Sequence, residues 1–355
     1  MLLPIFLGLF LAVTPAGDRT PDQVRVRLVT DEADAVLVIL GDREAGTPVN
    51  DADWQRLFNS DGYRRLKRRE ESMDRAFTED DFKKFVLSDD LLQKAPKLRQ
   101  ALKTWARASM DRPARLALAY LPKEAHIHAT VYIEIKPLTN SFVFEVGTDP
   151  AIILYLDPEV PREKFENTVA HELHHIGFGT CCPSKSDEDL QAKQSDRVQT
   201  VANWASAFGE GFAMLAAAGG KDVHPHAVSP IADRQRWDHD IAGFNKNQQD
   251  LDQFFRKILS GELNKDQASE QAYTYFGIQG PWYTVGWKIA VTIEEVYGRE
   301  RLIETMCNPA ALFAKYNDAA RELAKKGGPA LPLWSPEIIQ AMAPMQHSAS
   351  SVSSR

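Results

Sequence analysis

The feature that most constrains this chain is a mostly apolar segment with three histidines and a glutamate at its centre. The segment runs from Pro161 to Gly179 and reads H-E-L-H-H at residues 171–175. A proline favours the first turn of a helix and a glycine its end, so the sequence predicts one helix here. Residues four apart in a helix lie about 40° apart around the axis and about 6 Å apart along it. The first and last of these histidines can therefore reach one metal ion.

The segment matches the H-E-x-x-H motif, which makes His171 and His175 candidate metal ligands. Glu172 projects beside them, where it can hold a water molecule without taking a ligand position. Zinc lowers the pKa of a bound water to about 7, and a carboxylate can accept its proton as a general base. The alternative is a helix whose three histidines and glutamate face solvent. This helix is mostly apolar, however, and buried polar side chains need partners, which favours the metal site. His174 lies about 100° from His175, so we expect it to face a hydrogen-bond acceptor or solvent.

Glu210 is the first candidate for the third protein ligand that a catalytic zinc site requires. Residues 201–218 predict a helix that is apolar apart from this carboxylate and a few small polar groups. An ionised carboxylate in such a helix is costly unless a cation compensates it. The flanking Gly209 and Gly211 weaken a helix by about 1 kcal/mol each relative to alanine, which is understandable if another backbone approaches closely.

Two alternatives stay open for this part of the site. Glu210 can instead pair with an arginine at a contact between helices. Cys181 can be the third ligand, because it follows the motif-bearing helix directly. The longer motif that ends in a third histidine is absent, since Phe178 and Cys181 stand at its glycine and histidine positions.

The rest of the chain predicts an α+β fold, with a small antiparallel sheet beside a predominantly helical body. Residues 50–105 have helical periodicity, with a capping-box start at Thr78. Alternating apolar residues at 127–135 predict a half-buried strand, and residues 142–146 predict its hairpin partner. Residues 151–156 predict a third strand, and the pattern beyond them is helix after helix.

The charge pattern argues against nucleic-acid binding. The chain has 42 Lys and Arg against 49 Asp and Glu, a formal net charge of -7, whereas a nucleic-acid surface is basic. The basic run at residues 64–69 is followed directly by Glu70 and Glu71, which favours a solvated helix face over a nucleic-acid patch. No internal stretch reaches the roughly 18 apolar residues of a membrane span.

The two ends of the chain indicate export and a disordered tail. Residues 1–16 are uncharged and almost wholly apolar, so we expect a signal peptide that is cleaved after Ala16. The mature protein would then be periplasmic or extracellular. Residues 344–355 have a serine-rich end and are predicted to be disordered. Between these segments we expect a mainly helical region at 17–123 and a domain that carries the histidine motif at 124–343.

The three cysteines fit an oxidising compartment only in part. Cys181 and Cys182 are adjacent and cannot easily bridge each other, so one of them is expected to pair with Cys307 and leave an odd thiol. Three reduced thiols are the alternative, which would count against export.

These motifs together resemble the gluzincin-type zinc metallopeptidases, and more narrowly a bacterial family of zinc-dependent peptidases. The similarity extends from about Trp54 to Leu333 in the order of elements. Its specific parts are the histidine motif and residues 209–213, and residues 280–298 are also similar to that family. The departure is Met214, because thermolysin-like gluzincins have at this position an aspartate that orients a zinc-binding histidine.

The resemblance implies a zincin-like metallopeptidase domain that binds Zn²⁺ through His171, His175 and Glu210 and cleaves a peptide or protein. It also implies that residues 151–156 form an edge strand that binds the substrate backbone. Peptide hydrolysis needs donors for an oxyanion, and Tyr283 is the first candidate because it stands at a predicted helix start. Weaker candidates for this role are His224, His226 and His239.

Two rival functions use the same residues. The first is a zinc hydrolase that acts on a non-peptide amide. The second is a retired zincin, which binds metal and peptides without cleaving them. The intact Glu172 argues against the second, because a retired site would have no chemical need for a carboxylate beside the two ligands.

Overall fold

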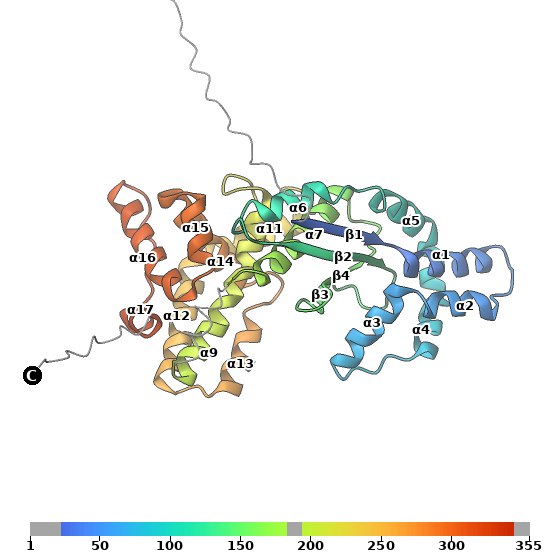
Figure 1. Cartoon of the computed structure of the whole chain (residues 1–355), viewed down its shortest axis with the longest axis horizontal. Helices are drawn as coiled ribbons and strands as arrows, with labels where there is room; N and C mark the ends of the chain where they lie inside the picture. Colours follow the sequence, from blue (N-terminus) through green and yellow to red (C-terminus); the bar gives the residue numbers. More distant parts are fainter. Residues whose placement is uncertain (1–22, 183–193, 344–355) are drawn as a thin grey trace, which may run out of the picture.

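The computed structural model describes residues 23–182 and 194–343, and helices make up most of it (Figure 1). The predicted signal peptide and the predicted disordered tail both lie outside the described residues. The elements before residue 123 are β1 (Val24–Val29), α1 (Asp31–Glu44), α2 (Asp51–Phe58), α3 (Asp61–Ser72), α4 (Glu79–Val86), α5 (Asp89–Trp105) and α6 (Asp111–Leu118).

The helical pattern predicted for residues 50–105 is confirmed as four helices, α2 to α5. Each begins at a residue whose side chain accepts a backbone N–H bond from the first turn: Asn50, Ser60, Thr78 and Ser88. Such caps satisfy donors that the helix itself leaves free. Short polar residues before apolar stretches therefore fix where these helices start.

The sheet is mixed and not antiparallel as predicted. Its strands are β1, β2 (Ile127–Glu134), β3 (Phe142–Phe144) and β4 (Ala151–Tyr155), in the spatial order β1-β2-β4-β3. Both β1 and β4 pair parallel with β2, and β3 runs antiparallel to β4. The α+β class is consistent with the prediction, but the predicted hairpin between residues 127–135 and 142–146 is wrong.

The burial of β2 explains this error. Thr130, Tyr132 and Glu134 were expected on a solvent face, yet all three are buried. A parallel sheet is covered on both faces, and β2 lies in the interior of this sheet with a strand on each side. One flank of β2 is taken by β1, which the sequence analysis did not predict, and the other by β4. Residues 151–156 were expected to form an edge strand, but β4 lies between β2 and β3 and is therefore an interior strand. The edges of the sheet are β1 and β3.

The elements after the sheet are all helical. They are α7 (Arg162–Gly179), α9 (Asp196–Ala205), a 3₁₀ turn η1 (Ser206–Phe208), α10 (Gly209–Ala218), α11 (Ile231–Ala242), α12 (Phe244–Ser260), α13 (Lys265–Thr274), α14 (Pro281–Tyr297), α15 (Arg299–Met306), α16 (Pro309–Lys325) and α17 (Pro336–Met342). None of the helices in the described ranges is long and apolar enough to cross a membrane.

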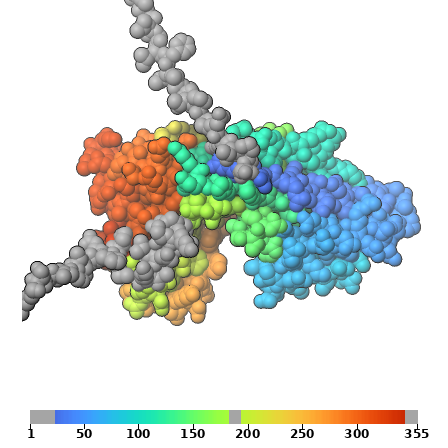
Figure 2. All heavy atoms as spheres, in the orientation of Figure 1, coloured from blue at the N-terminus to red at the C-terminus, as the bar shows by residue number. Residues whose placement is uncertain are grey.

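Two apolar cores hold these elements together. The first joins the N-terminal helices, the sheet and α7, with Val36, Ile152 and Leu173 among its fully buried members. The second joins α9, α10 and the helices from α12 to α17 around Trp282 and Phe255. Figure 1 shows these as two bodies with α7 and the sheet between them, and Figure 2 shows a notch between the bodies. The motif-bearing helix therefore lies where the two cores meet.

The predicted domain boundary at residue 123 falls inside the first core. β1, which precedes this residue, pairs along its whole length with β2, which follows it. The sheet therefore extends across the boundary, and the division of the chain at residue 123 stays a prediction.

Arg65 departs from the solvated face predicted for the basic run 64–69. Its guanidinium is buried and pairs with Glu145 at 2.6 Å and with Asp149, in the segment between β3 and β4. Arg64 and Arg68 are exposed as predicted. Arg68 also reaches Glu145, at 3.4 Å, and the guanidinium of Arg69 lies over the ring of Phe142 in β3. The basic run therefore holds α3 against the β3 side of the sheet and is not simply a solvated face.

A pair of buried carboxyl groups lies where α1 meets the end of β2. Glu32 and Glu134 are fully buried, and only one of their four oxygens, Oε2 of Glu32, has a hydrogen bond, at 2.9 Å from the Ile135 N–H. Burial raises the pKa of Glu32 to about 8 and that of Glu134 well above its ordinary value. Both groups are therefore neutral in mildly acidic solution.

Replacing Glu134 by glutamine is expected to stabilise the protein at pH 8.5 and to have little effect at pH 5. A carboxyl pKa that is raised in the folded state favours folding below the unfolded value, near 4.5, and this contribution is lost as the pH rises through the folded value. The gain at pH 8.5 should be at least about 1 kcal/mol. Urea unfolding at both pH values measures it, with the exposed Glu71→Gln as control. An equal change at both pH values would show that ionisation of Glu134 is not the cause.

Candidate metal centre

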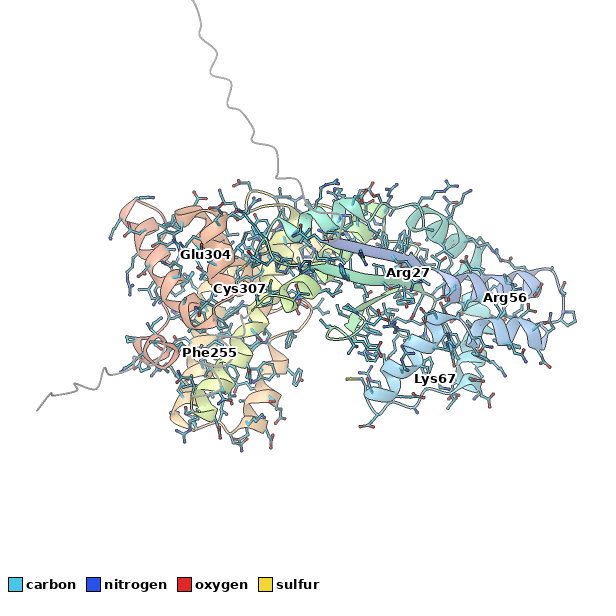
Figure 3. The ribbon with its side chains drawn as sticks, in the orientation of Figure 1. Arg27, Arg56, Lys67, Phe255, Glu304 and Cys307 are labelled. Atoms are coloured by element: carbon cyan, nitrogen blue, oxygen red, sulfur yellow. A yellow bond between two sulfur atoms is a disulfide. The ribbon has the colours of Figure 1, made fainter. Side chains whose placement is uncertain are left out.

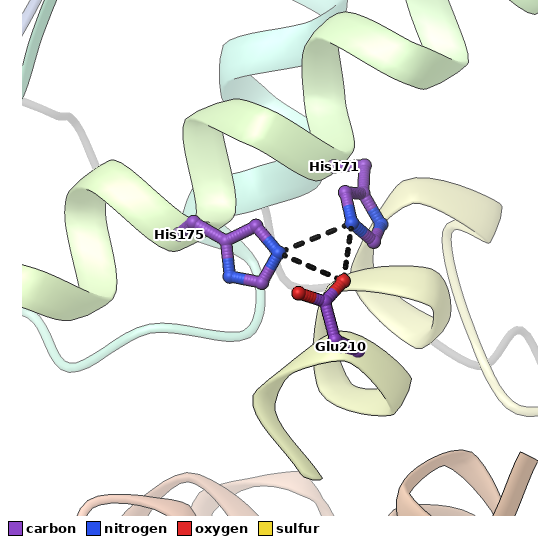
Figure 4. Close-up of side chains that lie close together, drawn as sticks. All are labelled: His171, His175 and Glu210. Carbon is purple, nitrogen blue, oxygen red and sulfur yellow. Dashed lines mark hydrogen bonds and ion pairs between the residues drawn. The ribbon is translucent and has the colours of Figure 1, made fainter. Parts of the chain in front are cut away.

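The helix α7 brings His171 and His175 together as the motif predicts. It begins after Pro161 and ends at Gly179, and its apolar face packs into the first core. The two histidines lie one turn apart on its other face, and their Nε2 atoms are 3.1 Å apart (Figure 4). The imidazoles are nearly perpendicular, with an angle of 80° between their planes. Both ring nitrogens therefore point at one small space.

Glu210 completes this group from a second helix. Its Oε2 lies 3.1 Å from Nε2 of His171 and 3.3 Å from Nε2 of His175. The predicted helix over 201–218 is divided into α9, η1 and α10, and Glu210 stands in the first turn of α10. Within the described parts of the chain, no arginine pairs with Glu210, so the alternative of an ordinary ion pair finds no support.

Gly211 allows α10 to approach the backbone of α14, as expected for one of the two glycines. A side chain at this position would overlap the backbone nitrogen of Trp287 and the carbonyl carbon of Gly286. Gly286 is in turn close to the backbone of Phe208. At Gly209, by contrast, a side chain would meet nothing within 4 Å. The close contact at Gly211 sets the position of Glu210 relative to α14.

The three converging atoms fit a zinc ion. With bonds of about 2.0–2.1 Å to zinc, ligand atoms of a tetrahedral site lie roughly 3.3–3.4 Å apart. The separations among His171, His175 and Glu210 are 3.1, 3.1 and 3.3 Å. Two imidazole nitrogens and one carboxylate oxygen are also the donor set of many catalytic zinc sites. These residues could therefore hold the metal without rearrangement of the helices.

The charges of this group support the same assignment. Burial opposes charge on His175, but the Glu210 carboxylate outweighs it and raises the pKa of His175 to about 9. Burial also acts to raise the pKa of Glu210, but the two imidazoles hold it well below its ordinary range. Glu210 is therefore ionised and half-shielded from water, a state that a cation beside it stabilises.

His174 is buried and turned away from the other two histidines. Its Nε2 lies 3.4 Å from the backbone carbonyl of Tyr120, which is the hydrogen-bond acceptor expected for this histidine. Burial, with the two neighbouring histidines, lowers the pKa of His174 to about 3, so the ring is neutral. Tyr120 was not singled out in the sequence, because nothing local marks a contact between residues 54 positions apart. This hydrogen-bond contact connects α7 to the end of α6.

The second ring nitrogen of His171 has no hydrogen-bond partner in the described part of the chain. Its Nδ1 is buried, and no hydrogen-bond partner lies among the residues that the structure describes. Zinc-binding histidines usually donate this N–H to a carboxylate or carbonyl. Thermolysin-like gluzincins have an aspartate that orients a zinc-binding histidine at the position of Met214. The unpartnered Nδ1 of His171 agrees with the absence of that aspartate here.

Tyr283 lies beside the group, in the first turn of α14. Its ring stacks on that of His171 with centroids 6.3 Å apart and 14° between the planes. Burial first, and then the Glu210 carboxylate, raise the pKa of Tyr283. The phenol therefore stays protonated, and its hydroxyl lies within hydrogen-bonding reach of the Glu210 carboxylate.

Glu172 stands next to the group without belonging to it. It is half-buried on α7, and its charge acts on both His175 and Tyr283. It is not part of the cluster formed by His171, His175 and Glu210. This is the arrangement that the motif predicts for a carboxylate that handles a proton.

The weaker candidates lie apart from the cluster. His224 pairs with Asp238 at 2.9 Å, buried His226 bonds Ser229 through Nδ1, and His239 is exposed on α11. Cys181 is also outside it, and its thiol bonds the backbone carbonyl of Gly177 at 3.4 Å. The structure therefore gives no support to Cys181 as a third ligand.

Cys182 is the cysteine that pairs with Cys307, and Cys181 is free. This disulfide joins the end of α7 to the end of α15, in the C-terminal body where Figure 3 labels Cys307. The expected odd thiol is thereby identified. The crosslink holds the motif-bearing helix to the second core.

Comparison with known proteins bears on this site. Residues 54–325, most of the chain, match the family described as "Putative zinc dependent peptidase (DUF5700)". The chain belongs to this family. No curated protein and no solved structure matches it. The DUF5700 match includes α7, α10 and α14, and the family description names the metal for which the three-residue group is suited.

Proposed function

We propose that the protein is a zinc-dependent peptidase of the gluzincin type with a zincin-like fold. The observation that carries the proposal is the convergence of His171, His175 and Glu210 from two helices, with Glu172 beside them. Zinc held there would supply a strongly acidified water and would polarise a substrate carbonyl. The DUF5700 family description supports both the metal and the reaction.

The residues around the ligands have separate roles in the proposed reaction. Glu172 accepts a proton from the attacking water and passes it to the leaving amine, the ordinary role of a general acid and base. Tyr283 donates a hydrogen bond to the oxygen that becomes negative in the transition state. His174 holds α7 to Tyr120 and so keeps the neighbouring His175 in place.

Replacing Tyr283 by phenylalanine is expected to retain zinc and to lower kcat with little change in KM. An oxyanion donor acts chiefly in the transition state, so its loss does not weaken ground-state binding. The decrease should be about 10²-fold, at the lower end of the range expected for Glu172. Steady-state kinetics at equal zinc content measure it, and the exposed Tyr273→Phe on α13 is the control. A rise in KM at constant kcat would assign Tyr283 to substrate binding instead.

Substrate binding by strand addition requires a different strand from the one predicted. β4 is flanked on both sides, whereas β3 pairs only with β4 and has a free edge among the described residues. An extended peptide could add to β3 through backbone hydrogen bonds. The substrate-binding edge is therefore one of the two edge strands, β3 or β1, in place of residues 151–156.

Cleavage of a broad peptide library separates this proposal from its two rivals. A peptidase cleaves library members, and cleavage stops when zinc is removed. A retired zincin binds peptides in the zinc-loaded state without cleaving them. A hydrolase of non-peptide amides leaves the library intact but releases amine from simple acylated amines. Absence of any cleavage by fully zinc-loaded protein would overturn the peptidase proposal.

We also propose that the protein is exported to the periplasm or the medium. The apolar residues 1–16 and the disulfide between Cys182 and Cys307 support this, because disulfides persist in oxidising compartments. The mature chain is then expected to begin near Gly17. Intact-mass measurement on protein from the native host checks this, and retention of residues 1–16 would contradict it.

A further inference from the structure

The N-terminal body contains a cavity with an apolar floor and a charged rim. Its volume is about 360 Å³, and it lies between α3, α4 and the segment that follows β2. This volume falls within the range of small-molecule sites. None of the residues that line it belongs to α7, α10 or α14. The cavity is therefore separate from the metal centre.

The floor is made by aromatic and aliphatic side chains of α3, α4 and the loop between them. Phe82 packs against Phe77 and against Phe85, with ring centroids 5.7 Å apart in each pair, and Leu66 closes the base. On the opposite lip Leu138 is 51% exposed. An apolar ligand on this floor would remove Leu138 and the aromatic edges from water, which is favourable.

The lip that carries Leu138 is held by a buried ammonium group. Nζ of Lys136 donates to the carbonyl oxygens of Leu138 and Asn140, each at 2.5 Å, and to Oδ1 of Asn140 at 3.0 Å. All three acceptors are neutral, and no carboxylate in the described residues pairs with this group. Burial lowers the pKa of Lys136 to about 8 although the Glu134 and Glu70 carboxyl groups oppose this, so the ammonium is mostly charged at pH 7.

On the α3 side, the Glu70 carboxylate at the rim is shared between Arg69, which does not line the cavity, and Arg75, which does. Glu70 is buried and bonds Arg69 at 2.8 Å, and it lies 3.4 Å from Arg75. Two guanidinium groups thus share one carboxylate. Arg75 is 44% exposed and has this one long contact, so most of its N–H donors face the cavity mouth or solvent.

The remaining charges on the rim cancel. Asp81 lines the cavity but pairs with Lys84 at 2.9 Å. The residues that line the cavity thus carry two cations, Arg75 and Lys136, and two carboxylates, Glu70 and Asp81. Above the apolar floor, the guanidinium of Arg75 keeps free donors. An arginine fork matches the two oxygens of a carboxylate.

We propose that this cavity binds a small amphiphile that has an apolar body and a single carboxylate. The body lies on the phenylalanine floor, and the carboxylate is held by the free guanidinium donors of Arg75 at the rim. A free fatty acid and the C-terminal apolar residue of a peptide share this chemistry. The proposal does not depend on the metal centre or on peptidase activity.

Calorimetric titration of the full-length protein with matched probes tests the ligand class. Decanoate, decanol and decyltrimethylammonium have the same chain and differ in head-group charge. Decanoate is expected to bind with one site per chain, decanol about tenfold or more weakly, and the cation more weakly still. N-acetylphenylalanine distinguishes the sources, since tighter binding than decanoate indicates a peptide terminus and weaker binding a fatty acid. Equal affinity for the three decyl probes, or no binding, overturns the proposal.

Three variants locate the site. Arg75→Gln should reduce the affinity for decanoate to that for decanol and leave decanol binding unchanged. Leu138→Asp should weaken both, because it places a charge on the apolar lip. Arg64→Gln is the matched control, since Arg64 is exposed on α3 but does not line the cavity. Circular dichroism verifies that each variant is folded. Full decanoate affinity in folded Arg75→Gln would contradict the assignment of the head group.

Discussion

Replacing Glu172 by glutamine is expected to leave zinc bound and to lower peptide turnover by about 10²–10⁴-fold. Glutamine has nearly the shape of glutamate but cannot accept the proton of the attacking water. Glu172 lies outside the group of His171, His175 and Glu210, so its neutral replacement should not disturb the ligands. The loss corresponds to about 3–5 kcal/mol of activation free energy.

The measurement is kcat for wild type and variant at equal zinc content. Glu163→Gln is the matched control, because Glu163 is an exposed carboxylate on the same helix and should behave as wild type. A zinc-loaded Glu172→Gln variant that cleaves at the wild-type rate would exclude Glu172 as general base. The peptide-binding interpretation would then describe the protein better.

Replacing Glu210 by alanine is expected to remove most of the zinc at neutral pH. Two imidazoles from one helix leave the site without its third protein ligand and without the charge that balances the cation. Loss of a residue that only hydrogen-bonds a metal ligand already lowers metal affinity about 10–100-fold. Loss of the ligand itself should therefore lower the zinc affinity by more than about 100-fold. Metal analysis after dialysis against a weak chelator measures this.

Cys181→Ser is the control for the second prediction. The thiol of Cys181 bonds backbone carbonyls at the end of α7 and lies outside the ligand group, so this variant should keep its zinc. Full zinc occupancy in Glu210→Ala, together with zinc loss in Cys181→Ser, would make Cys181 the third ligand.

The parts of the site that local patterns govern could be predicted from sequence. The periodicity of one helix fixes how His171 and His175 lie relative to each other, and the structure agrees. A lone carboxylate in an apolar run needs a cationic partner, and this singled out Glu210 before its position was known. The glycine beside it, Gly211, was expected to allow a close backbone contact and does so with α14.

The parts that depend on distant pairing could not be predicted in this way. The alternation in β1 gives no sign that it pairs parallel with β2, about 100 residues later, so the sheet was expected to be an antiparallel hairpin. The contact between His174 and Tyr120 and the burial of Arg65 against Glu145 are of the same kind. Each depends on which elements the two cores bring together, and local periodicity does not contain that information.

Titration of metal-free protein with zinc, with bound metal and peptide cleavage followed in the same samples, tests the central claim most directly. The claim is that one zinc, held by His171, His175 and Glu210, makes this chain a peptidase. Cleavage should then be absent without zinc and rise in proportion to bound metal until one zinc is bound per chain. Cleavage by the metal-free protein, or no cleavage with the site filled, would contradict the claim.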